Sequence, residues 1–482
     1  MGINYKKLGF KSGLEIHQQL DTGKLFCGCP SLLRKDGPDF TVQRKLHAVA
    51  GESGKVDIAA EYQAALKKTY EYQAYKDTTC LVELDEEPPH NINLEPLKIA
   101  LQVAFLLNCQ IQPLTQIMRK TVIDGSNTSG FQRTVLIAHS GFIETSEGRV
   151  GIESICLEED SARRVSNDNE KGLAVFRLDR LGIPLVEIAT APDLKNPEMV
   201  KEAALELGGI LRSLKVKRGI GTIRQDVNVS IREHPRVEIK GFQDPKMMVK
   251  TIELEIKRQQ ENIKNKNLKN EVRKALSNGK TEFLRPMPGA ARMYPETDLP
   301  LLKIHRNLIN EVKKSLPKLK KDISEELKAE GLHTEAIKVL LKENLVEEFK
   351  ELLKIVNNPK LIVKILVEIP KNMARRKNKS FREIQDILGK DILGRILDEV
   401  KKGKLKESHV KSVLEDIMDG KSVKQAIKIE EIDSMEVEEN ILKIIKKKPG
   451  LSEKAYMGLV MKEFKGKISG NDAMTIIKKY VK

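Results

Sequence analysis

Residues 157–188 concentrate carboxylates in a pattern that could bind a metal ion. Glu158 and Glu159 follow one apolar stretch, and Glu187 lies inside the apolar run 183–188. Burying a carboxylate in such a run is costly unless a cation or hydrogen bonds compensate its charge. Each of these acids therefore needs a partner.

Two kinds of partner fit these acids. The first is an arginine, because Arg163, Arg164 and Arg180 lie close by in the sequence. The second is magnesium, a hard ion that takes oxygen ligands and commonly bridges to the phosphates of a nucleotide. The residues alone leave both interpretations open.

Two other segments alternate polar and apolar residues, which predicts strands at residues 8–20 and 221–231. Side chains two positions apart in a strand share a face. The polar pairs placed in this way are Glu15 with His17 in the first strand and Arg224 with Asp226 in the second. Such a face is either open to water or lines a site, and an acid beside an imidazole favours the second interpretation.

The segment DGSNTSG, residues 124–130, separates two apolar runs and predicts a hairpin with an ordered loop. Lys120 precedes this loop and Ser126 lies inside it. Together with the backbone N–H groups, these side chains could bind an anion such as a phosphate. A solvated polar turn is the alternative.

The net charge predicts a polyanionic partner. The 482-residue chain carries 85 Lys plus Arg against 69 Asp plus Glu, a balance of +16. Nucleic acid is the natural candidate, although lysine-rich surfaces also accompany solubility or growth at high temperature. No apolar run reaches the roughly 18 residues of a membrane span, and the N-terminus lacks the apolar core of a signal peptide. We therefore expect a cytoplasmic protein.

Five cysteines over this length do not predict a disulfide framework. Cys27 and Cys29 form a C-x-C pair, which is half of a zinc site, but a closed site needs four ligands and no second pair follows. Cys80, Cys109 and Cys156 are expected to be isolated, reduced packing residues. The cysteines thus predict no zinc site.

The two halves of the chain differ in their patterns. The first mixes short β-rich runs with turns, and the second consists of amphipathic helices, which together predict an α+β protein. The expected domains are residues 1–300, a helical domain at 301–405 and a helical tail domain at 406–482. Helices are also expected in the first half, at 59–72, 94–108 and 246–275.

Basic turns recur along the helical half, which indicates a surface for RNA phosphates. Aromatic residues make up 4% of the chain and Trp is absent, so recognition of a folded RNA by shape is favoured over stacking on single-stranded bases. The residues expected to contact RNA are Arg375, Arg376, Lys377, Lys446, Lys447, Lys448, Lys465 and Lys467.

Several motifs together match a known family. They are GLEIHQQLDT, LFCGCP, DGSNTSGFQRT, LEEDSARR, RLDRLGIPLVEIATAPD, IRQDVNVSIR, VEIKG and MPGAARMYPETDLP. In these motifs the chain closely resembles the B/E family of glutamyl-tRNA(Gln) amidotransferase subunits, and its archaeal E-type members more than its bacterial B-type members. The resemblance runs from residue 5 to about residue 300. It continues more weakly to MGLVMKEFKGKISG, which is similar to the family's tail domain.

The resemblance implies a cradle-like catalytic domain that acts as an ATP-dependent kinase and transamidase, within a carbon–nitrogen ligase that uses glutamine as amide donor. The side-chain carboxylate of glutamate misacylated on tRNA(Gln) is phosphorylated, and ammonia then displaces the phosphate to give glutaminyl-tRNA. Activation is needed because a carboxylate is a poor acyl donor. Phosphoryl transfer depends mainly on positioning and charge neutralisation, which suits a group of carboxylates that hold magnesium.

The resemblance also implies site residues, cofactors and partners. The metal-binding and catalytic positions fall on Glu15, His17, Glu158, Glu159 and Glu187, and the nucleotide-binding positions on Lys120, Ser126, Arg224 and Asp226. The implied cofactors are ATP and Mg²⁺. The implied partners are glutamate-charged tRNA(Gln) and an asparaginase-like amidotransferase subunit of the D type, which supplies ammonia within a heterotetramer.

The chain departs from the family's pattern in two places. Residues 262–283 occupy the position of a large inserted domain of the archaeal E-type members, and the second cysteine pair that completes a zinc site in some bacterial-type relatives is missing. Two rival functions remain. A non-catalytic tRNA-binding scaffold leaves the acids without a role, and a kinase of small carboxylates leaves the basic helical half without one.

Overall fold

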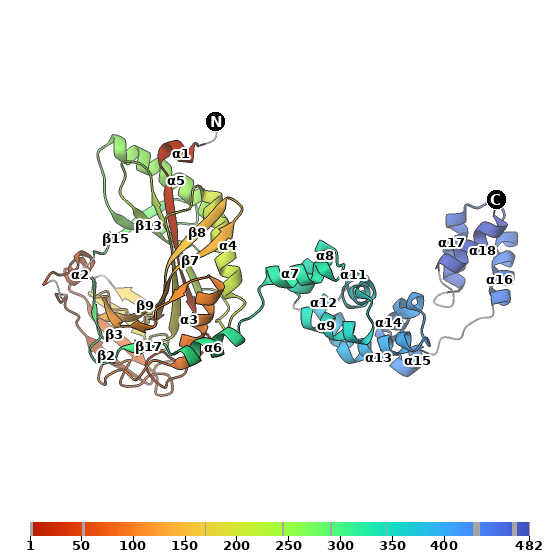
Figure 1. Cartoon of the computed structure of the whole chain (residues 1–482), viewed down its shortest axis with the longest axis horizontal. Coiled ribbons are helices and arrows are strands. Elements are labelled where there is room, and N and C mark those ends of the chain that lie inside the picture. Colours follow the sequence, from red (N-terminus) through yellow and green to blue (C-terminus); the bar gives the residue numbers. More distant parts are fainter. Residues whose placement is uncertain are drawn as a thin grey trace. The chain divides into compact units, whose positions relative to one another are not determined.

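The computed structural model describes residues 3–50, 54–168, 170–242, 245–289, 292–343, 345–427, 434–464 and 470–481. Contacts divide the chain into two compact units, Met1–Leu319 and Lys320–Lys482. The first unit combines helices with sheets and the second is helical (Figure 1). The predicted α+β fold class is confirmed.

An eleven-stranded sheet forms the centre of the first unit, in the order β15-β14-β13-β12-β1-β11-β8-β7-β6-β16 with β4 paired to β7. In that order the strands are Thr281–Pro286, Glu271–Ala275, Val237–Phe242, Ile223–Ser230, Lys11–Gln19, Pro184–Thr190, Gly148–Glu159, Phe131–Thr145, Ile117–Thr121 and Met293–Pro295, and β4 is Gln110–Ile111. The strand β1 therefore lies in the middle of the sheet, antiparallel to both β12 and β11.

Three helices cover one face of this sheet (Figure 1). They are α3 (Leu94–Leu106), α4 (Pro197–Leu211) and α5 (Pro245–Lys264). Alternation along β1 gives the sheet two different faces. Leu14 and Ile16 are buried in the core that the helices share, whereas Glu15 and His17 lie on the opposite face and are only partly buried. We call this opposite face the polar face of the sheet.

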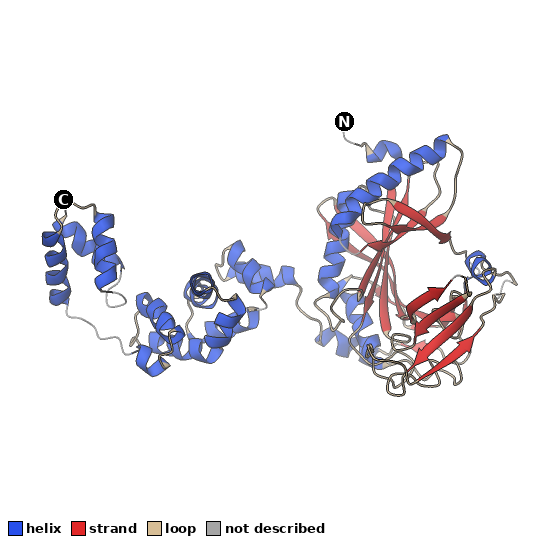
Figure 2. Ribbon diagram, turned by 180° about the vertical axis from the view of Figure 1, so that it is seen from behind, coloured by secondary structure: helices blue, strands red, loops and turns tan. Residues whose placement is uncertain are grey.

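A four-stranded sheet lies on the other side of the large sheet from these helices (Figure 2). Its order is β2 (Phe40–Arg44), β3 (Thr69–Ala74), β10 (Leu173–Arg177) and β9 (Arg163–Asp168). The hydroxyls of Tyr70 and Tyr72 donate to the carbonyls of Ile123 and Gly125, each at 2.9 Å. Gly125 has φ +87°, and a Cβ there would lie 2.1 Å from the Tyr70 ring. Only glycine therefore fits where the small sheet holds the loop between β6 and β7.

Short elements complete the first unit. They are α1 (Tyr5–Leu8), α2 (Ile58–Ala64), β5 (Leu114–Thr115), β17 (Leu302–Lys303) and α6 (Arg306–Lys314). The helix expected at 94–108 is confirmed by α3. The expected hairpin is also confirmed, because β6 and β7 pair antiparallel around the loop 122–130.

Two expected helices are wrong in their second halves. The helix expected at 246–275 ends at Lys264, and the chain then forms β14, which buries Val272 beside β13 and pairs with β15. The helix expected at 59–72 ends at Ala64, and β3 begins at Thr69. In both segments the pairing of a strand with its neighbours outweighs a weak local preference for helix.

The second unit is built from helices with two apolar clusters. A π-helical turn at Lys364–Glu368 joins α10 to α11. In chain order, α7 to α18 are Lys320–Ala329, Thr334–Lys342, Val346–Ile355, Pro359–Val363, Ile369–Lys377, Phe381–Ile387, Lys390–Lys401, Val410–Met418, Val423–Ile427, Ser434–Lys447, Glu453–Glu463 and Gly470–Tyr480. One cluster extends from Leu327 to Ala426 and the other from Val437 to Ile477. The division at residue 405 stays a prediction. Among the described residues, no helix is both long enough and apolar enough to cross a membrane.

A buried ion network fixes the segment around β16 to the sheet. The Glu296 side chain is fully buried and accepts hydrogen bonds from Arg119 and, at 2.8 Å, from Arg133 Nε. The Glu296 backbone N–H also donates to Ile117 O at 2.8 Å. Removing this carboxylate would leave Arg133 with its longer contact to Glu159 and Arg119 with the exposed Asp298, and loss of a buried counterion is one of the costlier changes that a core can undergo.

Glu296→Ala is therefore expected to lower the stability of the first unit by about 3 kcal/mol or more. Glu311→Ala is the matched control, because Glu311 forms an exposed pair with Lys98 that contributes at most about 1 kcal/mol. Scanning calorimetry of the whole chain measures both shifts. Equal melting temperatures for the two variants would show that the buried network does not hold the segment.

Candidate active site

Strand register brings acidic and basic side chains together at the centre of the polar face. On β1, Glu15 lies opposite Asp226 of β12, and His17 lies between Glu187 of β11 and Arg224 of β12. Side chains that are opposite one another on paired strands share a face and are neighbours. Three strands that are far apart in sequence thus supply one cluster.

The same face continues through β8, β7 and β6. Glu158 on β8 lies opposite Leu185 of β11, and Lys120 on β6 lies opposite Gln132 of β7. The Gln132 amide donates to Glu158 Oε2 at 3.1 Å. A cavity of about 960 Å³ opens over these strands. Its lining includes Glu15, His17, Lys120, Gln132, Arg180, Glu187, Arg224, Asp226, Glu238, Lys240, Arg285 and Arg292.

His17 lies at the meeting point of the carboxylates. Its Nε2 atom is 3.1 Å from Glu187 Oε2, 3.5 Å from Glu15 Oε1 and 3.9 Å from Glu158 Oε2. Two groups of potential metal ligands share this imidazole, and in each group the ligand atoms lie within 4.8 Å of one another. The groups are His17 with Glu158 and Glu187, and His17 with Glu15 and Asp226.

Lys120 places an ammonium group beside two of these acids. Its ammonium contacts Glu158 and lies 3.3 Å from Glu187 Oε2. Burial by itself would raise the pKa of Glu187, but the charges of Lys120 and His17 and their hydrogen bonds hold it well below its usual value. Burial would lower the pKa of Lys120, but Glu158 and Glu187 raise it above its ordinary value. Both groups are therefore charged at neutral pH.

Glu15 has the opposite character. Burial and the nearby charge of Glu187 raise its pKa above the ordinary value of a carboxyl, and the cation at His17 only partly offsets them. A raised pKa makes Glu15 a stronger base than an ordinary carboxylate. The pKa values of Glu15 and Glu187 are thus shifted in opposite directions, although both side chains approach the same imidazole.

A second lysine lies toward the β13 side of the cavity. Lys240 Nζ is 2.6 Å from Asp226 Oδ2 and 2.5 Å from Glu238 Oε1. Sequence reasoning singled out neither Lys240 nor Glu238. The alternation in VEIKG could have placed them, because Glu238 and Lys240 are two positions apart in a strand and so share a face. In the structure Glu238 lies opposite Asn228 of β12.

Arginine partners for the acids are present but serve different acids from those expected. The arginine alternative that the sequence left open is not the one found at Glu187, whose basic neighbours are Lys120 and His17. Arg180 lies 3.7 Å from Asp160 and Arg163 lies 2.6 Å from Asp179. Sequence proximity misled here because the partners of Glu187 come from other strands.

Three predicted site residues do not line the cavity, and of these Glu158 is buried just beneath it against Lys120. Glu159 follows Glu158 in β8 and so projects from the other face, where Arg133 Nη1 lies 3.3 Å from its carboxylate. Ser126 donates to Asp124 Oδ1 at 2.6 Å within the loop between β6 and β7. With Glu158 included, the structure brings together seven predicted positions, which are Glu15, His17, Lys120, Glu158, Glu187, Arg224 and Asp226. The roles of all nine residues stay predictions.

The predicted RNA contacts are distributed over the second unit. Arg375, Arg376 and Lys377 are exposed at the end of α11, where Arg376 pairs with Glu415 at 3.1 Å and Lys377 pairs with Asp419. Lys446, Lys447 and Lys448 are exposed at the end of α16. Lys465 and Lys467 lie outside the described residues.

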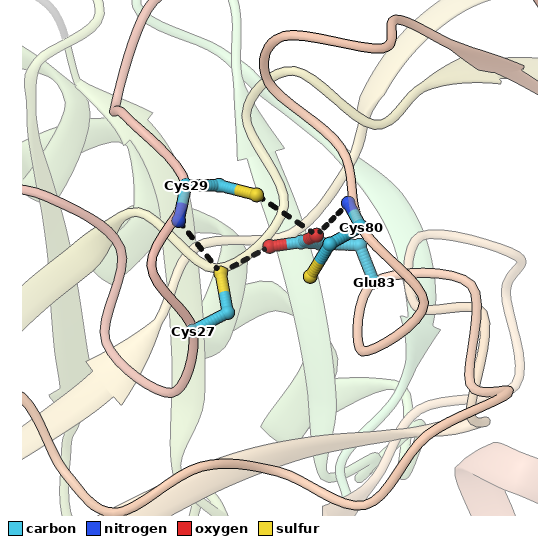
Figure 3. A group of neighbouring side chains, drawn as sticks. All are labelled: Cys27, Cys29, Cys80 and Glu83. Atoms are coloured by element: carbon cyan, nitrogen blue, oxygen red, sulfur yellow. Dashed lines mark hydrogen bonds between the residues drawn. The ribbon is translucent and has the colours of Figure 1, made fainter.

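The expectation that Cys80 is isolated is wrong. Its sulfur lies near those of Cys27 and Cys29 and near the carboxylate of Glu83, although more than fifty positions separate the C-x-C pair from Cys80 (Figure 3). A Cys-x-x-Cys pattern does not reveal this cluster in the sequence, because Glu83 stands where the second cysteine of such a pair would be.

Comparison with known proteins agrees with the resemblance seen in the motifs. A family profile described as the GatB/GatE catalytic domain matches residues 10–310. A Methanocaldococcus jannaschii protein, named as the E-type subunit of glutamyl-tRNA(Gln) amidotransferase, is 36% identical over 638 aligned residues that cover all of both chains. A protein of the same name from Archaeoglobus fulgidus is 34% identical over 625, covering all of this chain and 99% of its own. Because this chain has 482 residues, both alignments include positions that it lacks.

The ion pair between His17 and Glu187 predicts how the protonation of His17 and the stability of the chain depend on pH. Burial by itself would lower the pKa of His17, but the hydrogen bond to Glu187 and the charges of Glu187, Glu15 and Glu158 raise it above about 6.5, the ordinary value. Glu187→Gln is therefore expected to lower the pKa of His17, as followed by NMR titration of carbon-13-labelled histidine. A histidine with a raised pKa adds stability that is fully present below about pH 6.5 and is lost as the pH rises through the raised value.

Glu87→Gln is the control for this titration, because it removes an exposed carboxylate 3.2 Å from His90. The control should leave the His17 signal unchanged, and His17→Gln assigns that signal. If Glu187→Gln and Glu87→Gln give the same His17 pKa, the proposed charge balance at the centre of the cavity is wrong.

Proposed function

This chain belongs to the GatB/GatE family, and on that premise we propose that it is the tRNA-dependent subunit of a glutamyl-tRNA(Gln) amidotransferase. In this proposal it activates the side-chain carboxylate of glutamate attached to tRNA(Gln) and transfers that acyl group to ammonia. The observation that carries the proposal is the set of carboxylates around His17 and Lys120 in the large cavity.

The donor set of the cavity fits a magnesium nucleotide. Carboxylate oxygens from four strands approach His17, and oxygen ligands are those that magnesium prefers. Basic groups at the rim suit the phosphates, since Arg285 and Arg292 line both this cavity and a smaller neighbouring one. When bound, magnesium-ATP supplies the phosphoryl group and neutralises the charge that develops during its transfer.

In the first half-reaction, an oxygen of the glutamyl carboxylate attacks the terminal phosphorus of ATP, the bond to ADP breaks and an acyl phosphate forms. Carboxylates of the chain position the basic side chains that this step needs beside the phosphates. Lys120 is fixed by Glu158 and Glu187, so its ammonium can be presented to a phosphate without losing its own charge. Arg224 is held by Asp160 at 2.7 Å and faces the same cavity.

In the second half-reaction, ammonia attacks the carbonyl carbon, phosphate leaves and the nitrogen loses a proton. Glu15 is suited to accept that proton because its pKa is raised and it lines the cavity. The nitrogen thus becomes the neutral amide of glutamine. Water must be excluded meanwhile, since it would hydrolyse the activated acyl group.

A divalent ion and Lys120 would compete for the same carboxylate oxygens. Lys120 already occupies a position between Glu158 and Glu187. Glu158 and Glu187 would hold such an ion, which would supply positive charge in place of Lys120, and the Lys120 ammonium could then pair with a phosphate. In this way Lys120 serves as an internal counterion before the substrate binds.

The alternative of a non-catalytic tRNA-binding scaffold is less well supported. Holding buried acids and cations together costs desolvation energy, and a scaffold gains nothing from that cost. The basic helices of the second unit fit a role in tRNA binding under either function. Ammonia is proposed to come from an asparaginase-like partner within a heteromeric complex.

With ATP, magnesium and ammonium chloride, the chain alone is expected to convert glutamyl-tRNA(Gln) to glutaminyl-tRNA(Gln). It should not do so with glutamine or asparagine, because an amide nitrogen must first be released by a nucleophile. An asparaginase-like partner should restore use of an amide donor. Mass analysis of the amino acid recovered from the tRNA measures each conversion. Glutamine made from an amide donor by the chain alone would contradict the division of labour.

Glu187→Gln and Glu144→Gln form the matched pair for this assay. Glu144 is exposed and pairs only with Arg149 among the ion pairs that the structure defines for it. We expect Glu187→Gln to lower turnover by about 100-fold or more while tRNA affinity is kept, and Glu144→Gln to leave both unchanged. Unchanged turnover of Glu187→Gln at saturating ATP and magnesium would sink the proposed site.

The basic end of α16 predicts a salt effect on tRNA binding. Replacing Lys446, Lys447 and Lys448 by glutamine should weaken binding and reduce the slope of log affinity against log salt by roughly one for each lost phosphate contact. The control replaces the exposed Lys6, Lys7 and Lys11, which changes the net charge equally. If both triple variants lose the same affinity across the titration, the end of α16 makes no specific contact with tRNA.

A further inference from the structure

An apolar loop tip lies at the edge of the cavity, just before β12. Ile220 is 99% exposed and stands between Gly219 and Gly221, whose φ angles are +126° and +84°. All three residues line the cavity. A Cβ atom on either glycine would meet nothing within 4 Å, so the tip projects away from the rest of the chain. A fully exposed isoleucine gains free energy when a partner covers it.

The base of this loop, residues 217–222, is fixed although its tip is free. The buried Gln18 amide donates to the carbonyls of Lys217 and Thr222 at 3.0 and 3.1 Å. The Thr222 hydroxyl donates to the Gly219 carbonyl at 2.8 Å. Because Gln18 belongs to β1, the loop has a defined position relative to the central strand. Ile220 is thus held out in water by a rigid base.

The loop lies close to the strand positions that carry the reacting groups. Ile223 pairs with Gln18 of β1, and Arg224 lies opposite His17. Ile220 precedes Arg224 by four residues, which span at most about 14 Å of chain. A terminal nucleoside placed against Ile220 would therefore leave its attached acyl group near the carboxylates around His17.

Two arginines continue the positive charge outward from the loop. Arg212 and Arg218 are exposed, Arg218 Nη2 donates to the Arg212 carbonyl at 3.2 Å, and neither residue lines the cavity. No ion pair defined for the described residues involves either one. The neighbouring Lys215, by contrast, pairs with Glu95 at 2.5 Å. The outer side of the loop therefore suits a negatively charged partner.

We propose that this loop receives the unpaired 3′ end of the charged RNA, with Ile220 against the terminal base and Arg218 on the phosphate that precedes it. The inference rests on the proposed function, since it concerns how the same substrate enters the same cavity. Isoleucine is among the apolar side chains that proteins insert against bases, and a guanidinium can donate in parallel to two phosphate oxygens. Gly219 and Gly221 add no side chain that would keep the nucleotide away from the backbone.

ATP fits this loop less well than RNA does. A cavity of about 960 Å³ can hold a nucleotide and a glutamyl group, but the folded RNA must stay outside it. The RNA chain therefore has to pass an edge of the cavity, and Arg212 and Arg218 outside that edge would meet its next phosphates. ATP ends inside the cavity, where Lys120, Arg285 and Arg292 already suit its phosphates.

A fluorescent base tests the contact at Ile220 without any turnover. 2-Aminopurine replaces the terminal adenine of tRNA(Gln), and its emission is followed as the full chain is added to saturation. We expect Ile220→Ala to reduce the emission change by at least half. Leu205→Ala is the control, because Leu205 is exposed on α4, and it should leave the change intact. An equal change in Ile220→Ala and the unaltered chain, or none in either, would overturn the inference.

Binding of magnesium-ATP separates the two possible occupants of the loop. Ile220→Ala should change the affinity for magnesium-ATP, measured by calorimetry on the full chain, by less than about twofold. If the variant weakens magnesium-ATP binding while the 2-aminopurine signal stays complete, the adenine of ATP occupies the loop and the inference is wrong.

Amidation kinetics show whether the inference or the proposed function has failed. With ammonium chloride, Ile220→Ala should keep kcat and raise the KM for glutamyl-tRNA(Gln) about fivefold, as expected when about half the burial of an aliphatic side chain is lost. An unchanged KM in a chain that amidates contradicts the inference alone. A chain that never amidates but shows the emission change that depends on Ile220 contradicts the proposed function and supports the RNA contact.

Salt dependence tests the phosphate contact of Arg218. Arg218→Gln should reduce the slope of log tRNA affinity against log salt by roughly 0.7, the value for one contact to a single strand. Arg236→Gln is the control, because Arg236 is exposed and does not line the cavity. If both variants change the slope equally, Arg218 makes no specific contact with the RNA backbone and that part of the inference is wrong.

Discussion

The charge balance between Glu187 and its two cations is the constraint on which the candidate site depends. An unpaired carboxylate in this position would take up a proton, and only Lys120 and His17 keep it ionised. These cations come from β6 and β1, which lie on either side of β11 with β8 and β7 between β11 and β6. The strands from β1 through β11, β8 and β7 to β6 must therefore keep their register for the charges to meet.

The two-faced character of β1 explains how the protein meets this requirement. Its apolar residues pack under α3, α4 and α5, and its polar residues face the cavity. A shift of one residue in register would exchange the faces, burying Glu15 and His17 under the helices. The hydrophobic core thus fixes the site as firmly as any contact within it. The buried network at Glu296 extends this rigidity to the segment that carries Arg292.

Much of the site could be predicted from alternation and motifs, because both report on single strands. Glu15 and His17, or Arg224 and Asp226, share faces by spacing alone. The pairing of Glu187 with Lys120 depends on which strands are neighbours, which no local pattern encodes. The same limitation applies to Cys80, whose partners lie on another loop, and to residues 271–275, where sheet pairing replaces an expected helix. Glu159 illustrates the value of alternation, since adjacent strand residues face opposite sides and its side chain lies away from that of Glu158.

The most direct test of the proposed charge balance is to locate a divalent ion. Crystals of the chain soaked with Mn²⁺ and a non-hydrolysable ATP analogue allow anomalous scattering to place the metal. We predict a peak about 2.2 Å from carboxylate oxygens of Glu158 and Glu187, with the Lys120 ammonium displaced from between them toward a phosphate. An occupied nucleotide whose manganese lies away from these two acids, with Lys120 still paired to both, would contradict the account.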